Sequence, residues 1–441
     1  MKSLTVVVLT CMAAAVAAAV EKNPTWGRIS RTMERLERST EANPETVRVL
    51  FYGQSIVAQG WGRKHLIPEL KKRYPTVNFV DECRAIGGYQ SPTLIKTAEA
   101  DLYPFYPDIL FFHVYGPMDK YEEIIRRVRT RTTADIVLWT SHLNRNEGGS
   151  VKKIRELLEH PDERSLEIRR VADKYGCMFI DMRTKWCKML LEKNILSGVL
   201  LADTVHMKKE TLPTYAEMLW EDILAGGTPE ANPAAGQVTT APGALRLEFV
   251  GNRVTAVGDG QAGAVYDVFL DGRRTTEWAE MWTMTRASKA PGKNSWNPAI
   301  NRIDLGPAAP CREDWTLTLL AGGKEDGTAV PFTLKGSKTG EDGTGWSTNR
   351  FVSTSGRVVI EPSYWMSKFW WGYRKVKPEA GFEIRWRCVP MVEETYAPGA
   401  KGTTAVLVQN CPNGRHVLEL RPKKEGPLGI ASFTVYAPKA E

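Results

Sequence analysis

Two patterns of hydrophobic and polar residues divide the chain. In the first half, short apolar runs alternate with stretches whose apolar residues recur every three or four positions, as in buried strands and amphipathic helices. This alternation predicts an α/β domain with a three-layer, doubly wound parallel sheet, whose sites form at the carboxyl ends of the strands. The predicted strands are residues 47–53, 76–81, 108–116, 134–141 and 177–181, and the predicted helices are 66–73, 92–102, 119–129, 151–174 with a break near Pro161, and 212–224.

The pattern changes after residue 228. Residues 229–243 are dominated by Gly, Pro, Ala and Thr and have no periodicity, which is typical of a linker. Beyond it, short β-type runs recur between turn residues, which predicts an antiparallel β-sandwich over residues 244–441. We therefore predict four segments: a signal peptide over 1–19, an α/β domain over 20–228, the linker and the β-sandwich domain.

The amino terminus predicts export. Residues 1–19 hold one Lys followed by an apolar run that ends in small residues, which suits a signal peptidase. The run is shorter than the roughly 20 apolar residues of a membrane span, so we expect a secreted, extracellular or periplasmic protein without stable membrane insertion. Six of the seven cysteines lie beyond it, and none has zinc-like spacing to another Cys or His. We therefore predict no metal site, and the pairing of these cysteines stays open.

Charge argues against a nucleic-acid partner. The net charge of the 441 residues is +8, split almost evenly as +3 over residues 21–228 and +4 over residues 229–441. A nucleic-acid binder concentrates its basic residues in a patch or stripe. The densest basic run, Arg126, Arg127, Arg129 and Arg131, lies on a predicted amphipathic helix, where a solvated helix face explains it.

Two segments carry residues suited to nucleophilic catalysis. Ser55 directly follows the first predicted strand, at the edge of the sheet where sites form. Asp203 and His206 stand three residues apart just before the last predicted helix. At that spacing the carboxylate can fix the imidazole tautomer, which leaves the other ring nitrogen as a base toward a hydroxyl. A serine in a turn is by itself more often a helix cap, so the prediction depends on the two segments together.

This layout resembles the SGNH (GDSL-type) hydrolases over residues 47–224. The Gly53-Gln54-Ser55-Ile56 segment is similar to the family's first block, with Gln54 in place of Asp. Gly88 matches the Gly whose N–H binds the oxyanion, and Asp203 and His206 match the last block. In the third block, Gly-x-Asn-Asp, Gly116 can match the Gly and Asp119 the Asp, but Met118 then replaces the Asn. Counted without a gap from Asp108, the Gly falls on Tyr115 instead, and the amide is absent in either alignment.

The resemblance implies acyl transfer without a cofactor. Ser55 would be the nucleophile, His206 the base and Asp203 the residue that orients it, while the N–H groups of Ser55 and Gly88 would hold the oxyanion. The missing amide at Met118 needs a substitute, since loss of one oxyanion donor costs about 10²–10³ in rate. His142 and Asn144, at the exit of the fourth strand, and His113, within the third, are the candidates. From their places in the matched blocks, Gln54 and Gly116 are also expected to line the oxyanion or the substrate.

The β domain suggests a carbohydrate ester as substrate. Its densest aromatic groups, residues 364–365 and 369–371, either fill the sandwich core or stack on sugar rings. Residues 266–272 and 414–420 resemble strands of the jelly-roll domains that accompany carbohydrate esterases. This resemblance favours a secreted carbohydrate O-acetylesterase that acts on a small-molecule or polysaccharide ester. A lipid or aryl esterase on the same scaffold and a catalytically weak glycan-binding protein are the alternatives. The oligomeric state stays open.

Overall fold

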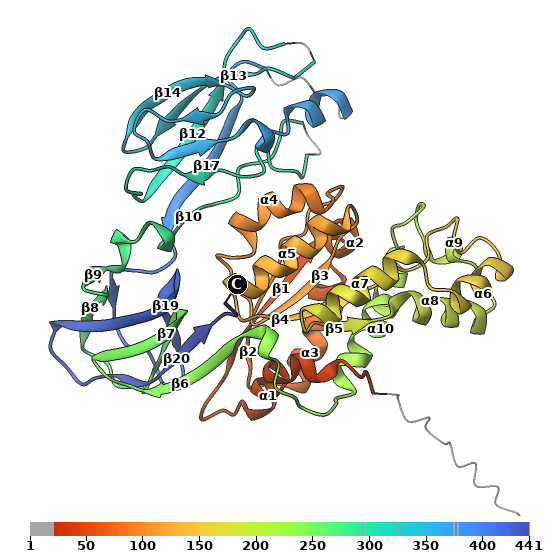
Figure 1. Cartoon of the computed structure of the whole chain (residues 1–441), viewed down its shortest axis with the longest axis horizontal. Helices are drawn as coiled ribbons and strands as arrows, with labels where there is room; N and C mark the ends of the chain where they lie inside the picture. Colours follow the sequence, from red (N-terminus) through yellow and green to blue (C-terminus); the bar gives the residue numbers. More distant parts are fainter. Residues whose placement is uncertain (1–21, 293–294, 325, 374, 377–378, 441) are drawn as a thin grey trace, which may run out of the picture.

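The chain folds into a parallel sheet covered by helices, followed by antiparallel sheets (Figure 1). The computed structural model describes residues 22–292, 295–324, 326–373, 375–376 and 379–440. The predicted fold class, α/β followed by antiparallel β, is confirmed. The signal peptide predicted over residues 1–19 lies outside the described residues. No helix within the described ranges combines the length and the apolar character needed to cross a membrane.

Five parallel strands form the first sheet, in the order β2-β1-β3-β4-β5. Side chains alternate between the two faces of a strand. Val49 and Phe51 of β1 therefore enter one hydrophobic core, and Leu50 and Tyr52 enter another on the opposite face. The strands are β1 (Thr46–Gly53), β2 (Asn78–Cys83), β3 (Ile109–His113), β4 (Asp135–Trp139) and β5 (Met178–Ile180).

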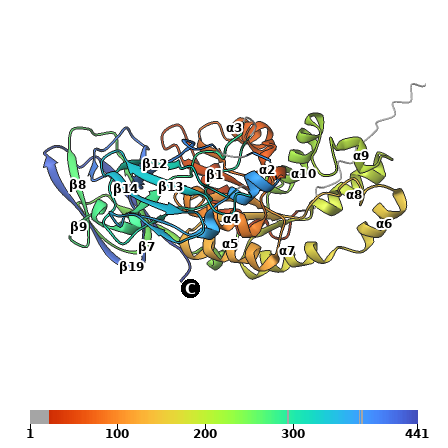
Figure 2. The same ribbon diagram turned by 90° about the horizontal axis from the view of Figure 1, so that it is seen from above.

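Helices cover both faces of this sheet. Helices α1, α3, α8 and α10 pack against one core, and α4, α5 and α7 against the other, which gives the three predicted layers. The helices are α1 (Ser30–Arg38), α2 (Ser55–Ala58), α3 (Ile67–Arg73), α4 (Ser91–Asp101), α5 (Met118–Arg131), α6 (Val151–Glu159), α7 (Glu163–Lys174), α8 (Met182–Glu192), α9 (Ser197–Leu200) and α10 (Leu212–Leu224). In the view of Figure 2, α6, α8 and α9 lie at the end of the molecule opposite the antiparallel strands.

The helical stretch predicted over residues 151–174 consists of two helices. Pro161 lacks the N–H that a continuous helix needs. Asp162 directly after it accepts a hydrogen bond from the Ser165 N–H and caps α7. The break predicted near Pro161 is thus confirmed.

The antiparallel part contains two hydrophobic cores, whereas we predicted one sandwich over residues 244–441. A seven-stranded sheet, in the order β18-β8-β19-β7-β20-β6 with β9 beside β8, surrounds one core. Between β9 and β18 the chain forms an inserted β unit, residues 282–390, whose five-stranded sheet (β10-β17-β12-β13-β14) and three-stranded sheet (β11-β16-β15) share the other core.

The strands of the antiparallel part differ from prediction in number and length. The predicted runs 404–408 and 416–420 belong to one long strand, and the segment predicted as a linker holds a strand that pairs with the last one. The strands are β6 (Gln237–Pro242), β7 (Arg246–Gly258), β8 (Val265–Leu270), β9 (Arg273–Arg274), β10 (Trp282–Met284), β11 (Asp304–Leu305), β12 (Glu313–Leu319), β13 (Pro331–Gly336), β14 (Gly340–Trp346), β15 (Phe351–Val352), β16 (Val358–Ile360), β17 (Glu383–Pro390), β18 (Thr395–Tyr396), β19 (Thr404–Lys424) and β20 (Ile430–Ala437).

The aromatic residues 364–365 and 369–371 pack against the core of the inserted β unit. Trp370 is fully buried there, and the other four are partly buried beside it. Residues 369–373 form a helical turn, so the alternation expected of a strand does not apply to them. The core interpretation of this cluster therefore fits the structure.

The basic run on α5 forms ion pairs and hydrogen bonds within the chain. Arg127 and Arg131 both pair with Glu99 of α4. Arg129 is buried, unlike the solvated residue we expected, and donates to the backbone carbonyls of Tyr175, Ala134 and Gly176. This part of the positive charge serves the packing of α5 against its neighbours.

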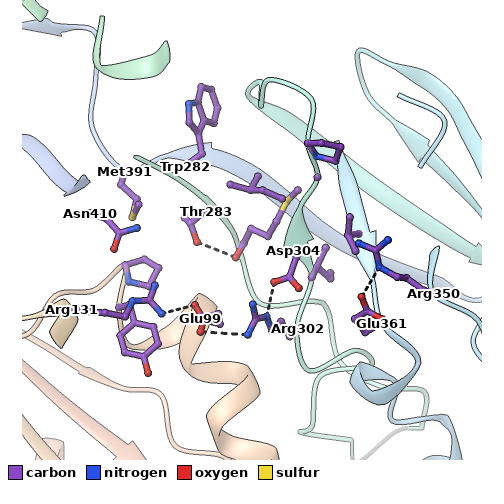
Figure 3. A pocket seen from close by; sticks show the side chains of 18 residues that line it. Glu99, Arg131, Trp282, Thr283, Arg302, Asp304, Arg350, Glu361, Met391 and Asn410 are labelled. Atoms are coloured by element: carbon purple, nitrogen blue, oxygen red, sulfur yellow. Dashed lines mark hydrogen bonds and ion pairs between the residues drawn. The ribbon is translucent and has the colours of Figure 1, made fainter. Parts of the chain in front are cut away.

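A cavity of about 580 Å³ marks the contact between the α/β part and the antiparallel part. Figure 3 shows Glu99 between Arg131 and Arg302 in this cavity, with Asp304 beyond Arg302. Arg131 lies 2.8 Å from Glu99, and Arg302 lies 2.5 Å from Asp304 and 3.5 Å from Glu99. These charges neutralise one another and join α4 and α5 to the inserted β unit.

A second ion pair across this contact is buried. Arg286 donates to the Asp101 carboxylate over 2.7–3.1 Å through two nitrogens, and also to the backbone carbonyl of Arg84. The Asp101 side chain is 4% exposed and that of Arg286 is 31% exposed. Because the Asp101 carboxylate has left bulk water and Arg286 has done so in part, breaking the pair costs free energy.

We predict that Asp101→Asn destabilises the protein by about 3 kcal/mol, the lower end of the range for a broken buried ion pair, because Arg286 is partly exposed. Urea denaturation of the purified protein measures the free energy of unfolding. Glu248→Gln in the exposed Arg246–Glu248 pair is the matched control and should cost less than about 1 kcal/mol. Equal costs in the two variants would contradict the prediction.

Candidate active site

Ser55 lies where the central strand β1 leaves the sheet. β1 ends at Gly53 and α2 begins at Ser55. A side chain at Gly53 would collide with neighbouring β3, since its Cβ would lie 2.1 Å from the carbonyl oxygen of His113. Glycine therefore allows the close approach that puts Ser55 at the carboxyl edge of the sheet, as the sequence predicts.

The buried Gln54 side chain holds the Ser55 hydroxyl. The Ile56 N–H donates to Gln54 Oε1 at 2.8 Å, and the Ser55 hydroxyl donates to the same oxygen at 2.7 Å. An N–H can only donate, so the atom facing Ile56 must be the amide oxygen. The Gln54 NH₂ group then faces His113 Nδ1, 3.2 Å away.

His113 extends this network into the sheet. Since Gln54 donates to its Nδ1, the proton of the neutral ring lies on Nε2 and is donated to Ser141 Oγ at 3.1 Å. Burial lowers the pKa of His113 to about 3, which keeps the ring neutral. His113, a candidate oxyanion donor, thus donates its one ring proton to Ser141 and accepts a hydrogen bond from Gln54. It has no second proton for an oxyanion.

Asp203 and His206 form a hydrogen-bonded pair. Asp203 Oδ2 lies 2.7 Å from His206 Nδ1, and Oδ1 accepts the N–H groups of Val205 and His206 at 2.8 Å each. These bonds, led by the one from the His206 N–H, lower the pKa of Asp203 to about 2. The carboxylate therefore stays ionised at neutral pH and holds the proton of the neutral imidazole on Nδ1, which leaves Nε2 as the basic nitrogen.

A two-bond clasp joins the Ser55 segment to the His206 loop. Gln59, at the end of α2, donates from Nε2 to the Met207 carbonyl at 2.8 Å, and its Oε1 accepts the Met207 N–H at 3.3 Å. Gln59 is four residues beyond Ser55, and Met207 follows His206 directly. The clasp therefore fixes the nucleophile candidate and the base candidate on neighbouring backbone.

The exit of β4 supports the same loop from the other side. The Arg145 N–H donates to the Thr204 carbonyl at 2.8 Å, and its guanidinium donates to the Asp203 carbonyl at 3.0 Å. His142 donates from Nε2 to the Val205 carbonyl at 2.8 Å. Three consecutive carbonyls of the loop that carries His206 are thereby fixed.

The N–H groups of Ser55, Gly87 and Gly88 have no hydrogen-bond partner among the described residues. Two of them, those of Ser55 and Gly88, are the predicted oxyanion donors. Gly88 has a φ of +78°, which favours glycine, and an added Cβ there would meet no atom within 4 Å. A Cβ on its neighbour Gly87 would lie 3.8 Å from Ser55 Cβ. The two predicted oxyanion donors thus belong to neighbouring backbone, as an oxyanion hole requires.

The other predicted oxyanion residues have different contacts. Gly116 is required by close packing, since a Cβ there would lie 2.8 Å from Ser91 Oγ. Met118 packs against the core beneath α5, so no amide replaces the Asn of the third block at that position. Asn144 Oδ1 accepts the N–H groups of Asn146 and Glu147 and caps its own turn.

His142 also differs from the role expected of it. Burial lowers its pKa to about 4, so the ring is neutral and carries one proton. That proton goes to the Val205 carbonyl, while Nδ1 is buried with no partner in the part of the chain that the structure describes. His142 therefore has no proton to offer an oxyanion, and it positions the loop of His206 instead.

In the conformation described, Ser55 Oγ donates to Gln54, and no hydrogen bond between described atoms joins it to His206. The roles of Gln59 and Ser141 could not be predicted from the sequence, because they depend on which strand ends lie side by side. Among the described residues, no group of three or more His, Cys, Asp and Glu side chains could hold a metal ion. The six cysteines beyond residue 21 are free thiols.

Comparisons with solved structures found similar proteins. A two-domain esterase active on acetylated mannans, co-crystallised with mannopentaose, is 14% identical over 94% of this chain and 95% of that chain, with a TM-score of 0.38. An acetylxylan esterase from Geobacillus stearothermophilus is 17% identical over 40% of this chain and 94% of its own, with a TM-score of 0.34.

An alpha/beta hydrolase enzyme from the metagenome of Lake Arreo, Spain, is 15% identical over 41% of this chain and 97% of its own, with a TM-score of 0.34. No family model matches the chain. No curated protein matches it. The function of the chain therefore has to be argued from the geometry of its site.

We predict that acid destabilises the protein partly through His142. Its pKa is about 4 when folded and about 6.5 when unfolded, so the unfolded chain binds more protons between these values. The stabilisation is complete above pH 6.5 and is lost as the pH falls toward 4, with a slope of up to about 1.4 kcal/mol per pH unit. Urea denaturation at several pH values measures this slope.

His142→Gln keeps a donor for the Val205 carbonyl and removes the titrating ring, so its free energy of unfolding should fall less steeply with acid. The exposed His160 supplies the matched control, His160→Gln, which should keep the wild-type slope. A wild-type slope in His142→Gln would show that the ring is not the titrating group.

Proposed function

We propose that the protein is a serine esterase of the SGNH type that removes O-acetyl groups from a carbohydrate. The observation that carries this proposal is the meeting of three features at one sheet edge. They are the Ser55 hydroxyl, the oriented Asp203–His206 pair clasped to it through Gln59, and two N–H donors without partners. A nucleophile, a base and an oxyanion site are the parts that acyl transfer needs.

In the proposed mechanism, Ser55 turns from Gln54 to His206. His206 Nε2 takes the hydroxyl proton as Ser55 Oγ bonds to the ester carbonyl carbon, and the N–H groups of Ser55 and Gly88 bind the resulting oxyanion. The C–O bond to the sugar then breaks, and His206 returns the proton to the leaving sugar oxygen. Water hydrolyses the acetyl-enzyme with His206 as base, and Asp203 stabilises the imidazolium in both steps.

The site favours a carbohydrate over a lipid. Gly88 borders open space, and the half-exposed indole of Trp296 lies beside Gly87. Aromatic rings of this kind pack against the C–H faces of sugars. A preference for lipid or aryl esters over acetylated polysaccharides would favour the alternative of a lipid or aryl esterase.

The proposal includes export, since residues 1–19 have the charge, apolar run and small-residue end of a cleaved signal peptide. We predict that the protein expressed with its full sequence in a bacterial host is found outside the cytoplasm and begins between residues 18 and 20. Amino-terminal sequencing of the exported protein measures this. A mature chain that begins at Met1 would contradict the prediction.

The enzymatic proposal predicts that wild type hydrolyses p-nitrophenyl acetate and that Ser55→Ala loses at least about 10³-fold in kcat. Asp203→Asn should lose about 10³–10⁴-fold, because the neutral amide no longer holds the imidazole in its productive tautomer. Acetate release from acetylated mannan and acetylated xylan, compared with release from a triglyceride emulsion, decides the substrate class.

His160→Gln is the matched control, since the exposed His160 ends α6 and belongs to none of the hydrogen bonds described around Ser55 and His206. It should keep the wild-type rate. Equal rates in wild type and Ser55→Ala would remove Ser55 as the nucleophile. No turnover in wild type, combined with retained binding to acetylated mannan, would favour the glycan-binding alternative.

A further inference from the structure

A segment of the inserted β unit reaches the candidate active site. Trp296 donates from its indole Nε1 to the carbonyl oxygen of Gly87 at 2.8 Å, and Asn297 donates from Nδ2 to the same oxygen at 3.3 Å. These residues are more than 200 positions from Gly87 in sequence. Two donors from the antiparallel part therefore act on one peptide of the α/β part.

The segment that supplies these donors is firmly held. Four residues of the segment are buried, namely Asn297, Ala299, Ile300 and Asn301. Trp296, directly before Asn297, is 49% exposed. Asn301 also accepts a hydrogen bond from the Tyr89 hydroxyl at 2.5 Å. The inserted β unit thus contacts the loop on both sides of Gly88, at Gly87 and at Tyr89.

The peptide between Gly87 and Gly88 has little intrinsic restraint. Neither residue has a side chain, so rotation of this peptide meets the fewest steric barriers of any residue pair. The structure has no cis peptide bond among its described residues, so the Gly87 carbonyl and the Gly88 N–H point in opposite directions. Donors that fix the carbonyl oxygen therefore also fix the direction of the N–H.

The position of this peptide makes its direction matter. A Cβ on Gly87 would lie 3.2 Å from Trp296 Nε1 and 3.8 Å from Ser55 Cβ, so the residue lies between the indole and the nucleophile candidate. The Gly88 N–H is one of the two predicted oxyanion donors described above. An N–H that could turn away would have to be reoriented in each turnover, and preorganised donors avoid that cost.

We propose that Trp296 and Asn297 are positioning residues that complete the oxyanion hole from the inserted β unit, by holding the Gly87 carbonyl so that the Gly88 N–H faces the acyl oxygen. This inference rests on the proposed esterase function. In this proposal the antiparallel part belongs to the active site, because it supplies the two side-chain donors to the Gly87 carbonyl.

The test uses the full-length protein and p-nitrophenyl acetate, a substrate without a sugar. Trp296→Phe keeps an aromatic ring and removes the N–H donor. It should lower kcat about 10-fold with KM unchanged, since Asn297 still holds the carbonyl, and the double variant with Asn297→Ala should lose about 10²-fold, as for a misplaced catalytic group. A loss in kcat without a change in KM is the signature of a transition-state contact.

A second readout does not depend on turnover. A fluorophosphonate that phosphonylates Ser55 also places an oxygen in the oxyanion hole, so its rate of inactivation should fall by the same factors. Trp346→Phe is the matched control, because Trp346 is similarly exposed, at 43%, on β14. It should leave both rates unchanged. Thermal unfolding of each variant separates loss of positioning from loss of fold.

The possible outcomes distinguish failure of the positioning role from failure of the proposed esterase function. Ser55-dependent hydrolysis with unchanged kcat and inactivation rate in Trp296→Phe and in the double variant would overturn the positioning role and leave the esterase proposal standing. A loss confined to acetylated mannan would also overturn it, because that pattern assigns the indole to sugar contact alone. Absence of Ser55-dependent hydrolysis in wild type would overturn the proposed function, and this inference with it.

Discussion

The orientation of the buried Gln54 amide is the constraint on which the geometry of the site depends. The side chain is 2% exposed, so its oxygen and its nitrogen both need partners inside the protein. The Ile56 N–H leaves only one orientation of the amide, and that orientation sets the tautomer of His113 and the direction of the Ser55 hydroxyl. One backbone N–H in a short helix thereby fixes a chain of polar groups across two strands.

Around this chain, the site is assembled from segments that are distant in sequence. β1 delivers Ser55, the loop before α10 delivers His206, and the exit of β4 holds that loop by its carbonyls. The inserted β unit adds donors at Gly87. Parallel strands make this possible, because their carboxyl ends meet at one edge whatever their order in the chain. The helices on both faces of the sheet keep that edge in place.

The sequence predicted what depends on local pattern and missed what depends on distant packing. Apolar runs located the five parallel strands, and residue type with spacing located Ser55 and the Asp203–His206 pair. β6 was hidden because its Thr, Ala and Pro residues have no hydrophobic alternation, yet it pairs with β20 at the other end of the antiparallel part. The sequence predicted one β-sandwich where the structure has two β cores, because strand periodicity does not reveal which strands share a core.

The same limit applies to single residues of the site. His142 was expected near an oxyanion, but its proton is taken by the Val205 carbonyl, a contact set by how the loop at 201–207 folds back. Nothing near Trp296 in the sequence distinguishes it from the other tryptophans of the antiparallel part. Its importance arises only because residues 295–297 fold over Gly87, which no local pattern encodes.

The way in which the inserted β unit connects to the larger sheet allows the length and sequence of the insert to vary. The chain leaves the seven-stranded sheet after β9 and returns at β18, and both of these short strands pair with β8. Entry and exit therefore share one strand, so the length and sequence between them can vary while the larger sheet keeps all its pairings. The segment over Gly87 belongs to this exchangeable unit, whereas Ser55 and His206 belong to the part that stays. A changed insert can thus alter the surroundings of the reacting bond and leave Ser55 and His206 as they are, provided that it still supplies donors to the Gly87 carbonyl and a partner for Asp101.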